Sequence, residues 1–384
     1  MNGDTILNII WFIVFFVLMF FYSKIMLSQL IMKLERSAQR LEMLSVNARR
    51  MIVRKVGKKS KNLEGRIALF QDFFAIEPSS LDPFGIVKKL DNLVRMVETK
   101  FKDFVNEIAP EKSQVEKQEI NYGLRAAIGV HHIAKTVRHY VETAKKFNNL
   151  QAAILLQMQL PIIERLAQAE FNGTKAFLNG WPVGDSIGPL VAASLIDKPK
   201  PISEGVVYGK TKILDRDVFV VKASGPGPEL GRIDEAVKKL IRKYKISRVI
   251  TIDAMGKLEG EKTGSVAFGS GFAMGGDVQK EIIENILLPK GISVDAIGVK
   301  VGTGEAIIPM KREIFNSLPR VMELVKYFIK KTKKNDKILI IGVGNSSGVG
   351  NNKKAVEEVK LAIKKIEKIN KKQVANKKKK WGWF

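Results

Sequence analysis

The residue whose setting most strongly suggests chemistry is an aspartate at the end of a short apolar run. Asp253 directly follows residues 249–252, a β-branched run typical of a buried strand. Glu259, Glu261 and a series of glycines come after it. Because open α/β sheets bind ligands at the carboxyl ends of their strands, we expect a functional site here. The structural alternative is that Asp253 ends a turn and that the glycines only allow tight backbone.

Two further glycine-rich segments each stand between a predicted strand and a predicted helix. They read SGPG at 224–227 and GVGNSSGVG at 342–350. Backbone N–H groups in such loops can bind an anion. The residues that could contact a cofactor in this way are Ser224, Gly225, Gly342, Gly344 and Asn345. Neither segment is a Walker A loop, and tight strand-to-helix turns explain the glycines, so a nucleotide cofactor is not favoured.

Strands alternate with helices in the part of the chain that contains these residues. The predicted strands are residues 206–208, 218–223, 249–252, 294–301 and 338–343. The predicted helices are residues 233–244, 278–288, 311–331 and 353–369. This alternation predicts an α/β domain over residues 180–369, with a mainly parallel sheet and helices on both faces. Asp185 stands just before an apolar helix and is expected to be its N-cap.

An all-helical region precedes this α/β domain. The helical patterns cover residues 84–108, 115–147 and 150–178. They predict a helical region over residues 78–179. The three histidines of the chain all belong to the second pattern: His131, His132 and His139. No acid stands at a metal-binding spacing from them, so we expect structural or surface histidines.

The N-terminus carries a long apolar run. Residues 6–22 read ILNIIWFIVFFVLMFFY, and Lys24 closes the run. This length is at the short end of the range for a membrane-spanning helix and predicts a transmembrane anchor over residues 1–28. Lysines and arginines follow on the C-terminal side only, so the positive-inside rule places the N-terminus outside and the rest in the cytoplasm. The expected localisation is the cell membrane, with a single span.

A heptad pattern continues after the apolar run. Its seam positions are Leu27, Leu30, Leu34, Ser37, Leu41, Leu44, Ala48 and Met51. Such a seam could pair two copies of the chain as a homodimer, or pack on the chain's own body. With the basic linker at residues 54–61, the pattern predicts a juxtamembrane segment over residues 29–77.

The chain is strongly basic and has no cysteine. Among 384 residues there are 65 Lys+Arg against 39 Asp+Glu, a net charge of +26. Such a charge attracts nucleic acid or an anionic membrane surface. The tail at residues 370–384 ends in KKKKWGWF, whose lysines and tryptophans favour lipid over RNA, so nucleic acid is not the expected partner. The absence of cysteine excludes a disulfide, a thiolate nucleophile and a cysteine-ligated metal.

Three segments of the α/β region together resemble one protease superfamily. GDSIGPLV at 184–191 resembles the D-x-x-G-P motif of germination proteases and hydrogenase maturation endopeptidases. Residues 249–266 resemble their second motif, a strand ending in (V/I)DA before a glycine-rich turn, and IIGVGN at 340–345 resembles their G-x-G-N strand. The whole chain resembles an uncharacterised archaeal family of membrane-anchored proteins. The motif order differs from that of the proteases, since G-x-G-N comes last here and no histidine follows His139.

The resemblance implies a fold of phosphorylase/hydrolase-like type and a pair of facing acids. Asp185 matches the first acidic position of the superfamily and Asp253 the second. The superfamily places these carboxylates across a cleft at the strand ends, where they could share a proton and activate water. They could also hold a divalent metal together with Glu259 or Glu261. A rearranged sheet could still bring Asn345 close to Asp185.

These expectations combine into one function hypothesis and one alternative. The hypothesis is a membrane-anchored cytoplasmic peptidase-like hydrolase that uses Asp185 and Asp253 on a protein or peptide substrate. The alternative is a non-catalytic, membrane-tethered binding or scaffold protein of the same fold. The missing histidine, the motif order and the heptad pattern favour the alternative.

Overall fold

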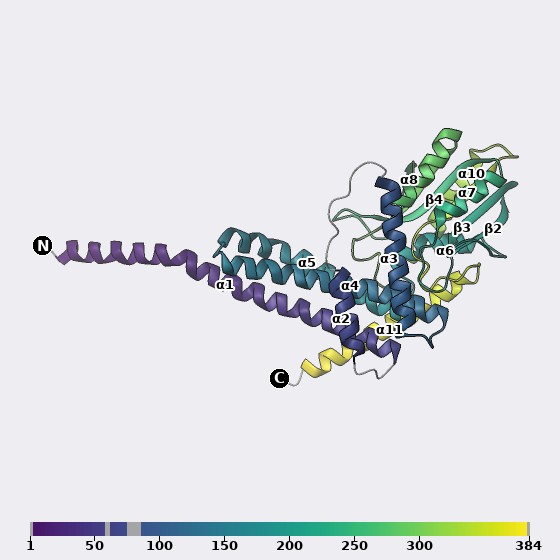
Figure 1. The fold of residues 1–384 in the computed structure, drawn as a ribbon. Helices are drawn as coiled ribbons and strands as arrows, with labels where there is room; N and C mark the ends of the chain where they lie inside the picture. The colour runs from purple at the N-terminus through teal and green to yellow at the C-terminus, as the bar shows by residue number, and fades with distance from the viewer. Residues whose placement is uncertain (1–2, 58–61, 75–85, 382–384) are drawn as a thin grey trace.

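The chain folds into a helical part and an α/β part, both near one end of a very long helix. The structure, a computed structural model, describes residues 3–57, 62–74 and 86–381. The first helix, α1 (Gly3–Val56), is continuous over 54 residues. Figure 1 shows it extending away from the rest of the molecule, with the N-terminus at its far end. The α/β part therefore lies remote from the start of the chain.

Three long helices form the centre of the helical part. The helices that follow α1 are α2 (Leu63–Phe74), α3 (Ile86–Ile108), α4 (Gln114–Lys146) and α5 (Leu150–Leu178). α1 packs along α4 and α5, and α3 contacts both α4 and the α/β part (Figure 1). α4 begins at a capping box, in which the side chains of Ser113 and Glu116 each accept the other's backbone N–H.

The heptad seam of α1 is buried within the same chain. Leu34 and Leu41 are at most 1% exposed. They belong to one hydrophobic cluster with Val137 and Val141 of α4 and Leu160 of α5. The seam therefore packs on the chain's own body, which is one of the two alternatives that the pattern left open.

No helix in the described part of the chain is long and apolar enough to cross a membrane. The predicted transmembrane anchor at residues 1–28 is therefore wrong, and so are the single-pass localisation and the membrane contacts deduced from it. The apolar run stands at the short end of the membrane-spanning range. At the rise of an α-helix, residues 6–22 span about 26 Å, less than the roughly 30 Å of a hydrocarbon core. The same helix then continues without a break into a charged segment.

The α/β part is built on one seven-stranded mixed sheet. Its strands are β1 (Lys200–Ser203), β2 (Val206–Ile213), β3 (Arg216–Ala223), β4 (Ile246–Gly256), β5 (Val266–Ser270), β6 (Ser293–Val301) and β7 (Lys337–Gly342). Their order is β1-β2-β3-β7-β4-β6-β5. The prediction of a mainly parallel sheet is wrong. Only β3, β7, β4 and β6 are parallel neighbours. Short connections make β1, β2 and β3 pair antiparallel at one edge, and β5 pairs antiparallel with β6 at the other.

Helices cover both faces of this sheet. One face carries α6 (Ile187–Ser194), α10 (Leu318–Lys330) and α11 (Ala355–Trp381); the other carries α7 (Ile233–Lys243) and α8 (Asp277–Leu287). Short helical turns complete the chain: η1 (Gly184–Ser186), η2 (Leu288–Lys290) and α9 (Arg312–Phe315). In β7, Ile338 and Ile340 belong to the core under α6, α10 and α11. Leu339 and Ile341 belong to the core under α7 and α8. This alternation fixes the face to which each strand residue points.

The structure differs from the predicted elements at several ends. β4 extends to Gly256, so Asp253 lies inside the strand and not after it. β1 and β5 are additional strands. The predicted tail at 370–384 belongs to α11 up to Trp381, and its last three residues lie outside the described residues. Part of the predicted basic linker, residues 58–61, also lies outside them.

Candidate functional site

Asp253 lies near the carboxyl end of β4, and two backbone N–H groups hold its carboxylate. The residue is 5% exposed. Ala254 donates to Oδ1 at 2.7 Å, and Gly275 donates to Oδ2 at 2.8 Å. Gly275 belongs to the segment between β5 and α8, which is also fixed to β4 by the N–H of Ala273 donating to Thr251 Oγ1 at 2.9 Å. Asp253 therefore fastens this glycine-rich loop over the end of its strand.

Asp185 lies in η1, the turn that leads into α6. The prediction that it is the N-cap of this helix is wrong, because Ser186 occupies that position. The carboxylate of Asp185 instead accepts, at Oδ2, the N–H of Asn345 at 2.7 Å. Asn345 belongs to the loop after β7. The rearranged strand order therefore does bring Asn345 beside Asp185, as expected.

Two glycines let the turn that carries Asp185 sit directly on the strand ends. A Cβ atom on Gly188 would lie 2.1 Å from a carbonyl oxygen just beyond β7 and 2.4 Å from the carbonyl oxygen of Ile252. A Cβ atom on Gly344, whose φ is +119°, would lie 2.1 Å from the carbonyl oxygen of Asp185. Because Ile252 precedes Asp253, this close packing brings both acids to the same edge of the sheet.

The two acids influence each other electrostatically. Burial raises the pKa of Asp185, and the N–H of Asn345 lowers it in part. Burial, and then the charge of Asp185, raise the pKa of Asp253 to about 7, against the opposing effect of its two N–H donors. Like charges in one buried site disfavour double ionisation. The pair can therefore present one carboxylate and one carboxylic acid at the same time near neutral pH.

The two glutamates that were expected to complete a metal site lie elsewhere. The side chain of Glu259 is 91% exposed and lies 3.8 Å from Arg165. Glu261 pairs with Lys300. No group of three or more acidic or histidine side chains that could hold a metal ion occurs among residues 3–57, 62–74 and 86–381. Neither Glu259 nor Glu261 therefore joins the acid pair, because β4 continues past Asp253 and carries both glutamates away from it.

Most N–H groups of the two glycine-rich loops that could contact a cofactor form hydrogen bonds within the protein. In the second loop the donors and acceptors are Asn345 to Asp185, Ser346 to Glu229, Ser347 to Asn345, Gly348 to Pro226 and Val349 to Ser346. In the first loop, Ser224 donates to Gly205 and Gly225 donates to Asn351. An anion site needs free N–H groups. The glycines, Gly342 and Gly344 included, therefore serve the close packing of the strand ends.

A buried lysine that the sequence did not reveal as important lies on the same edge of the sheet. Lys222 is 0% exposed and stands level with Gly342 in the β3–β7 register. Its ammonium group donates to the carbonyl of Ala223 at 2.7 Å and to Asn351 Oδ1 at 2.9 Å. Burial lowers the pKa of Lys222 to about 7. A lysine ending an otherwise apolar strand is the signal that could have identified it.

Lys222 and the acid pair nevertheless belong to different environments. Alternation along the strands directs Lys222, like Val220, to the face covered by α6. The same rule directs Asp253, like Val249, to the face covered by α7 and α8. Lys222 therefore supports the loop before α11 and faces away from Asp253.

A groove of about 490 Å³ opens beside Asp253. It lies over the carboxyl end of β4 and the middle of β6 and β5, and the segment between β5 and α8 forms one side of it. Met255, Phe272 and Met274 give it apolar walls, while Asp253 supplies its one carboxylate. An apolar groove with a single buried acid is the composition expected of a site that orients a substrate.

The helical and α/β parts coincide with two domains of one protein family. A family model described as "Protein of unknown function (DUF1512) N-terminal domain" matches residues 8–180. A second, described as "Domain of unknown function (DUF1512) C-terminal", matches residues 183–350. The chain belongs to the DUF1512 family. No curated protein and no solved structure matched it. The family match is coarser than the motif resemblance, because it names no protease.

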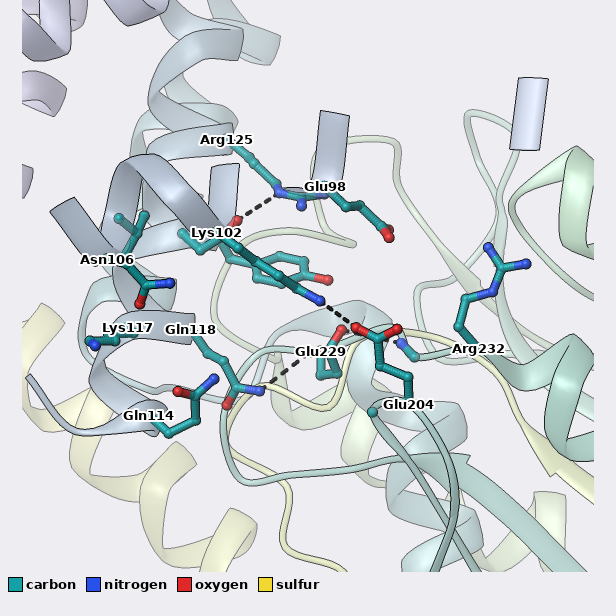
Figure 2. A pocket seen from close by; sticks show the side chains of 15 residues that line it. Glu98, Lys102, Asn106, Gln114, Lys117, Gln118, Arg125, Glu204, Glu229 and Arg232 are labelled. Atoms are coloured by element: carbon teal, nitrogen blue, oxygen red, sulfur yellow. Dashed lines mark hydrogen bonds and ion pairs between the residues drawn. The ribbon is translucent and has the colours of Figure 1, made fainter. Parts of the chain in front are cut away.

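A second cavity of this DUF1512 protein lies between its two domains. It measures about 260 Å³ and is lined by α3, α4 and the segments around Glu204 and Glu229 (Figure 2). Its polar groups pair across the domain boundary: Lys102 of α3 donates to Glu204 at 2.5 Å, and Gln118 of α4 donates to Glu229 at 3.3 Å. The cavity is therefore a polar interface that joins the two domains.

This interface reaches the loop that holds the first acid. The carbonyl oxygen of Glu229 accepts the N–H of Ser346 at 2.9 Å. Ser346 follows Asn345, whose N–H donates to Asp185. The second cavity thus does not border the acid pair but is connected to it through one short segment of backbone.

Proposed function

We propose that this DUF1512 protein is a peptidase-like hydrolase in which Asp185 and Asp253 activate water. The observation that carries the proposal is the electrostatic coupling of two acids from different elements at one sheet edge, where the charge of Asp185 helps raise the pKa of Asp253 to about 7. Two acids that differ in protonation can act as base and acid in one reaction. The resemblance of both surrounding motifs to a protease superfamily supports an amide bond as the target.

The proposed reaction conserves the single proton of the pair. The ionised carboxylate takes a proton from water, whose oxygen attacks the carbonyl carbon of the amide. The protonated carboxyl group gives its proton to the amide nitrogen as the C–N bond breaks. The products are a carboxylic acid and an amine, and the pair again holds one proton, now on the other aspartate.

The backbone around the pair supports this role. Three N–H groups, of Ala254, Gly275 and Asn345, fix the orientation of the two carboxyl groups before any substrate binds. Fixed dipoles in a site shielded from water need no reorganisation during the reaction. The one-proton state also predicts a bell-shaped pH profile, in which activity falls at low pH as both acids become protonated and at high pH as the shared proton is lost.

The test is the hydrolysis of a peptide library by the full chain and by Asp185→Asn and Asp253→Asn variants. Each variant is expected to lose roughly 10²-fold or more of the activity, since each removes one proton-transfer group. Glu259→Gln is the matched control, because this exposed acid lies outside the pair. Activity that survives both aspartate substitutions would remove these residues from the mechanism. A chain that hydrolyses nothing but retains a stable partner would support the non-catalytic alternative.

A further inference from the structure

The floor of the groove beside Asp253 is made of glycine and alanine. On the sheet face to which Asp253 points, β6 contributes Ala296 and Gly298, and β5 contributes their partners Gly269 and Ala267. Asp253 itself stands opposite Gly298. The buried residues of the core under α7 and α8 include none from β5 or β6. β5 and β6 therefore contribute no large side chain to this end of the sheet face.

Flexible apolar side chains stand around this floor. Met255 is 39% exposed and lies across Gly298, where a Cβ atom would be 2.2 Å from the methionine sulfur. Phe272 and Met274 are partly buried and come from the loop that Asp253 holds. The floor spans two strand spacings, or about 10 Å, which is wide enough for a leucine or phenylalanine side chain. Methionine walls adapt to apolar groups of different shape.

We propose that this groove binds one large apolar side chain of an extended peptide and so places the neighbouring amide bond at Asp253. The proposal rests on the proposed hydrolase function and adds the class of substrate. Asp253 lines the groove, so an occupant cannot fill it without approaching the carboxyl group. The rest of the lining is apolar or backbone, so it selects by shape and hydrophobicity. Met255, Phe272 and Met274 are the specificity-determining residues.

The structure offers a way to fill the groove without disturbing the fold. A Cβ atom on Gly269 meets no other atom within 4 Å, and the residue does not have a positive φ. A leucine there would project from the floor into the groove. Gly256, at the end of β4, meets the same two conditions but does not line the groove. Gly256→Leu is therefore a matched control for Gly269→Leu.

The experiment measures binding separately from cleavage. Two fluorescein-labelled peptides, GSAGFAGS and GSAGSAGS, differ only in one central residue. Their affinities are measured by fluorescence anisotropy for the full chain carrying Asp185→Asn, which blocks turnover and does not line the groove. The phenylalanine peptide is expected to bind roughly ten- to a hundredfold more tightly, the gain from burying one large apolar side chain.

Substitutions in the groove then test the location. Gly269→Leu is expected to reduce the affinity for the phenylalanine peptide to that for the serine peptide, whereas Gly256→Leu retains the preference. Met255→Ala is expected to weaken the preference several-fold, and Met255→Leu to restore it. Equal affinities for the two peptides, no binding of either, or a preference unaffected by Gly269→Leu would each overturn the proposal.

Turnover of the same peptides by the unmodified chain separates this proposal from the hydrolase function. If the chain binds the phenylalanine peptide more tightly but cleaves neither peptide, the groove proposal stands and the hydrolase function is refuted. If the chain cleaves both peptides with equal kcat/KM, the hydrolase function stands and the groove is not its specificity site.

Discussion

The backbone N–H of Asn345 donates a 2.7 Å hydrogen bond to Oδ2 of Asp185, across 160 residues of sequence. The side chain of Asn345 in turn accepts the N–H of Ser347 at 2.9 Å, which shapes the loop that carries the donor. Because the donor is a backbone group, its position depends on the loop conformation. Gly344, directly before Asn345, is the point at which this conformation is most easily disturbed.

Gly344→Ala is expected to destabilise the protein and to displace the Asn345 donor. The residue has φ +119°, and its added Cβ atom would lie 2.1 Å from the carbonyl oxygen of Asp185. Backbone strain of this kind costs on the order of 1–3 kcal/mol. Urea unfolding measures the loss, with Gly256→Ala as control because its Cβ atom meets open space. Equal stability of the two variants would show that the loop is not constrained at this point.

The free energy of unfolding is expected to depend on pH through the protonation of Asp253. Folding raises the pKa of Asp253 from 3.8 to about 7. The folded state therefore gains most from this group below its unfolded pKa, and the gain is lost as the pH rises from about 4 to about 7. Asp253→Asn should reduce this fall, to which one group contributes at most about 1.4 kcal/mol per pH unit, while Asp185, whose pKa burial also raises, keeps its own contribution. Urea unfolding at pH 4, 5.5 and 7 measures this fall in unfolding free energy. Glu259→Gln, the control, should leave the fall unchanged. Parallel pH curves for the unmodified chain and both variants would contradict the prediction.

Lys222 is expected to produce a pH dependence at the alkaline end. Burial lowers the pKa of its ammonium group from 10.5 to about 7 in the folded chain. The contribution of the neutral Lys222 amine to the free energy of unfolding is therefore complete above pH 10.5 and is lost as the pH falls toward about 7. Lys222→Met should flatten the stability curve between pH 7.5 and 10, measured by urea unfolding. Lys198→Met, at an exposed lysine, is the control, and an equal flattening there would refute the assignment.

A buried ion cluster is expected to hold the two domains together. Arg232 is 5% exposed and donates to Asp91 of α3 and to Asp234, each at 2.8 Å. Arg232→Met leaves a buried carboxylate without its cation, which should cost roughly 3–5 kcal/mol of unfolding free energy. The double variant Arg232→Met/Asp234→Asn should recover part of that loss in urea unfolding. A double variant less stable than the single one would argue against the cluster.

The regular elements could be predicted where sequence periodicity is strong. The pattern over residues 150–178 coincides with α5. β5 could not be predicted in the same way, because VAFGS contains glycine and alanine and has little intrinsic preference for a strand. It forms because β6 offers it a partner. The glycine and alanine of β5 also form part of the groove floor. The small residues that made the strand hard to predict therefore shape the candidate site.

The candidate site could be predicted only in part, because spacing along the chain does not give direction in space. The motifs brought attention to Asp185 and Asp253, which the fold places at one sheet edge. Glu259 and Glu261 follow closely in sequence, but the continuation of β4 to Gly256 carries them away. The transmembrane anchor was predicted from the apolar run at the N-terminus in a similar way. Composition alone does not show where a helix ends, and α1 continues to Val56.

Glu229 connects the two domains at a point that constrains their evolution. Its side chain accepts from Gln118 of the helical domain at 3.3 Å, and its carbonyl accepts from Ser346, beside the Asp185 loop, at 2.9 Å. A chain that kept only the α/β domain would lose the first of these bonds and loosen the second. The two halves are therefore expected to be inherited as one unit, and a substitution in α4 has to be compatible with a loop more than 200 positions further along the chain.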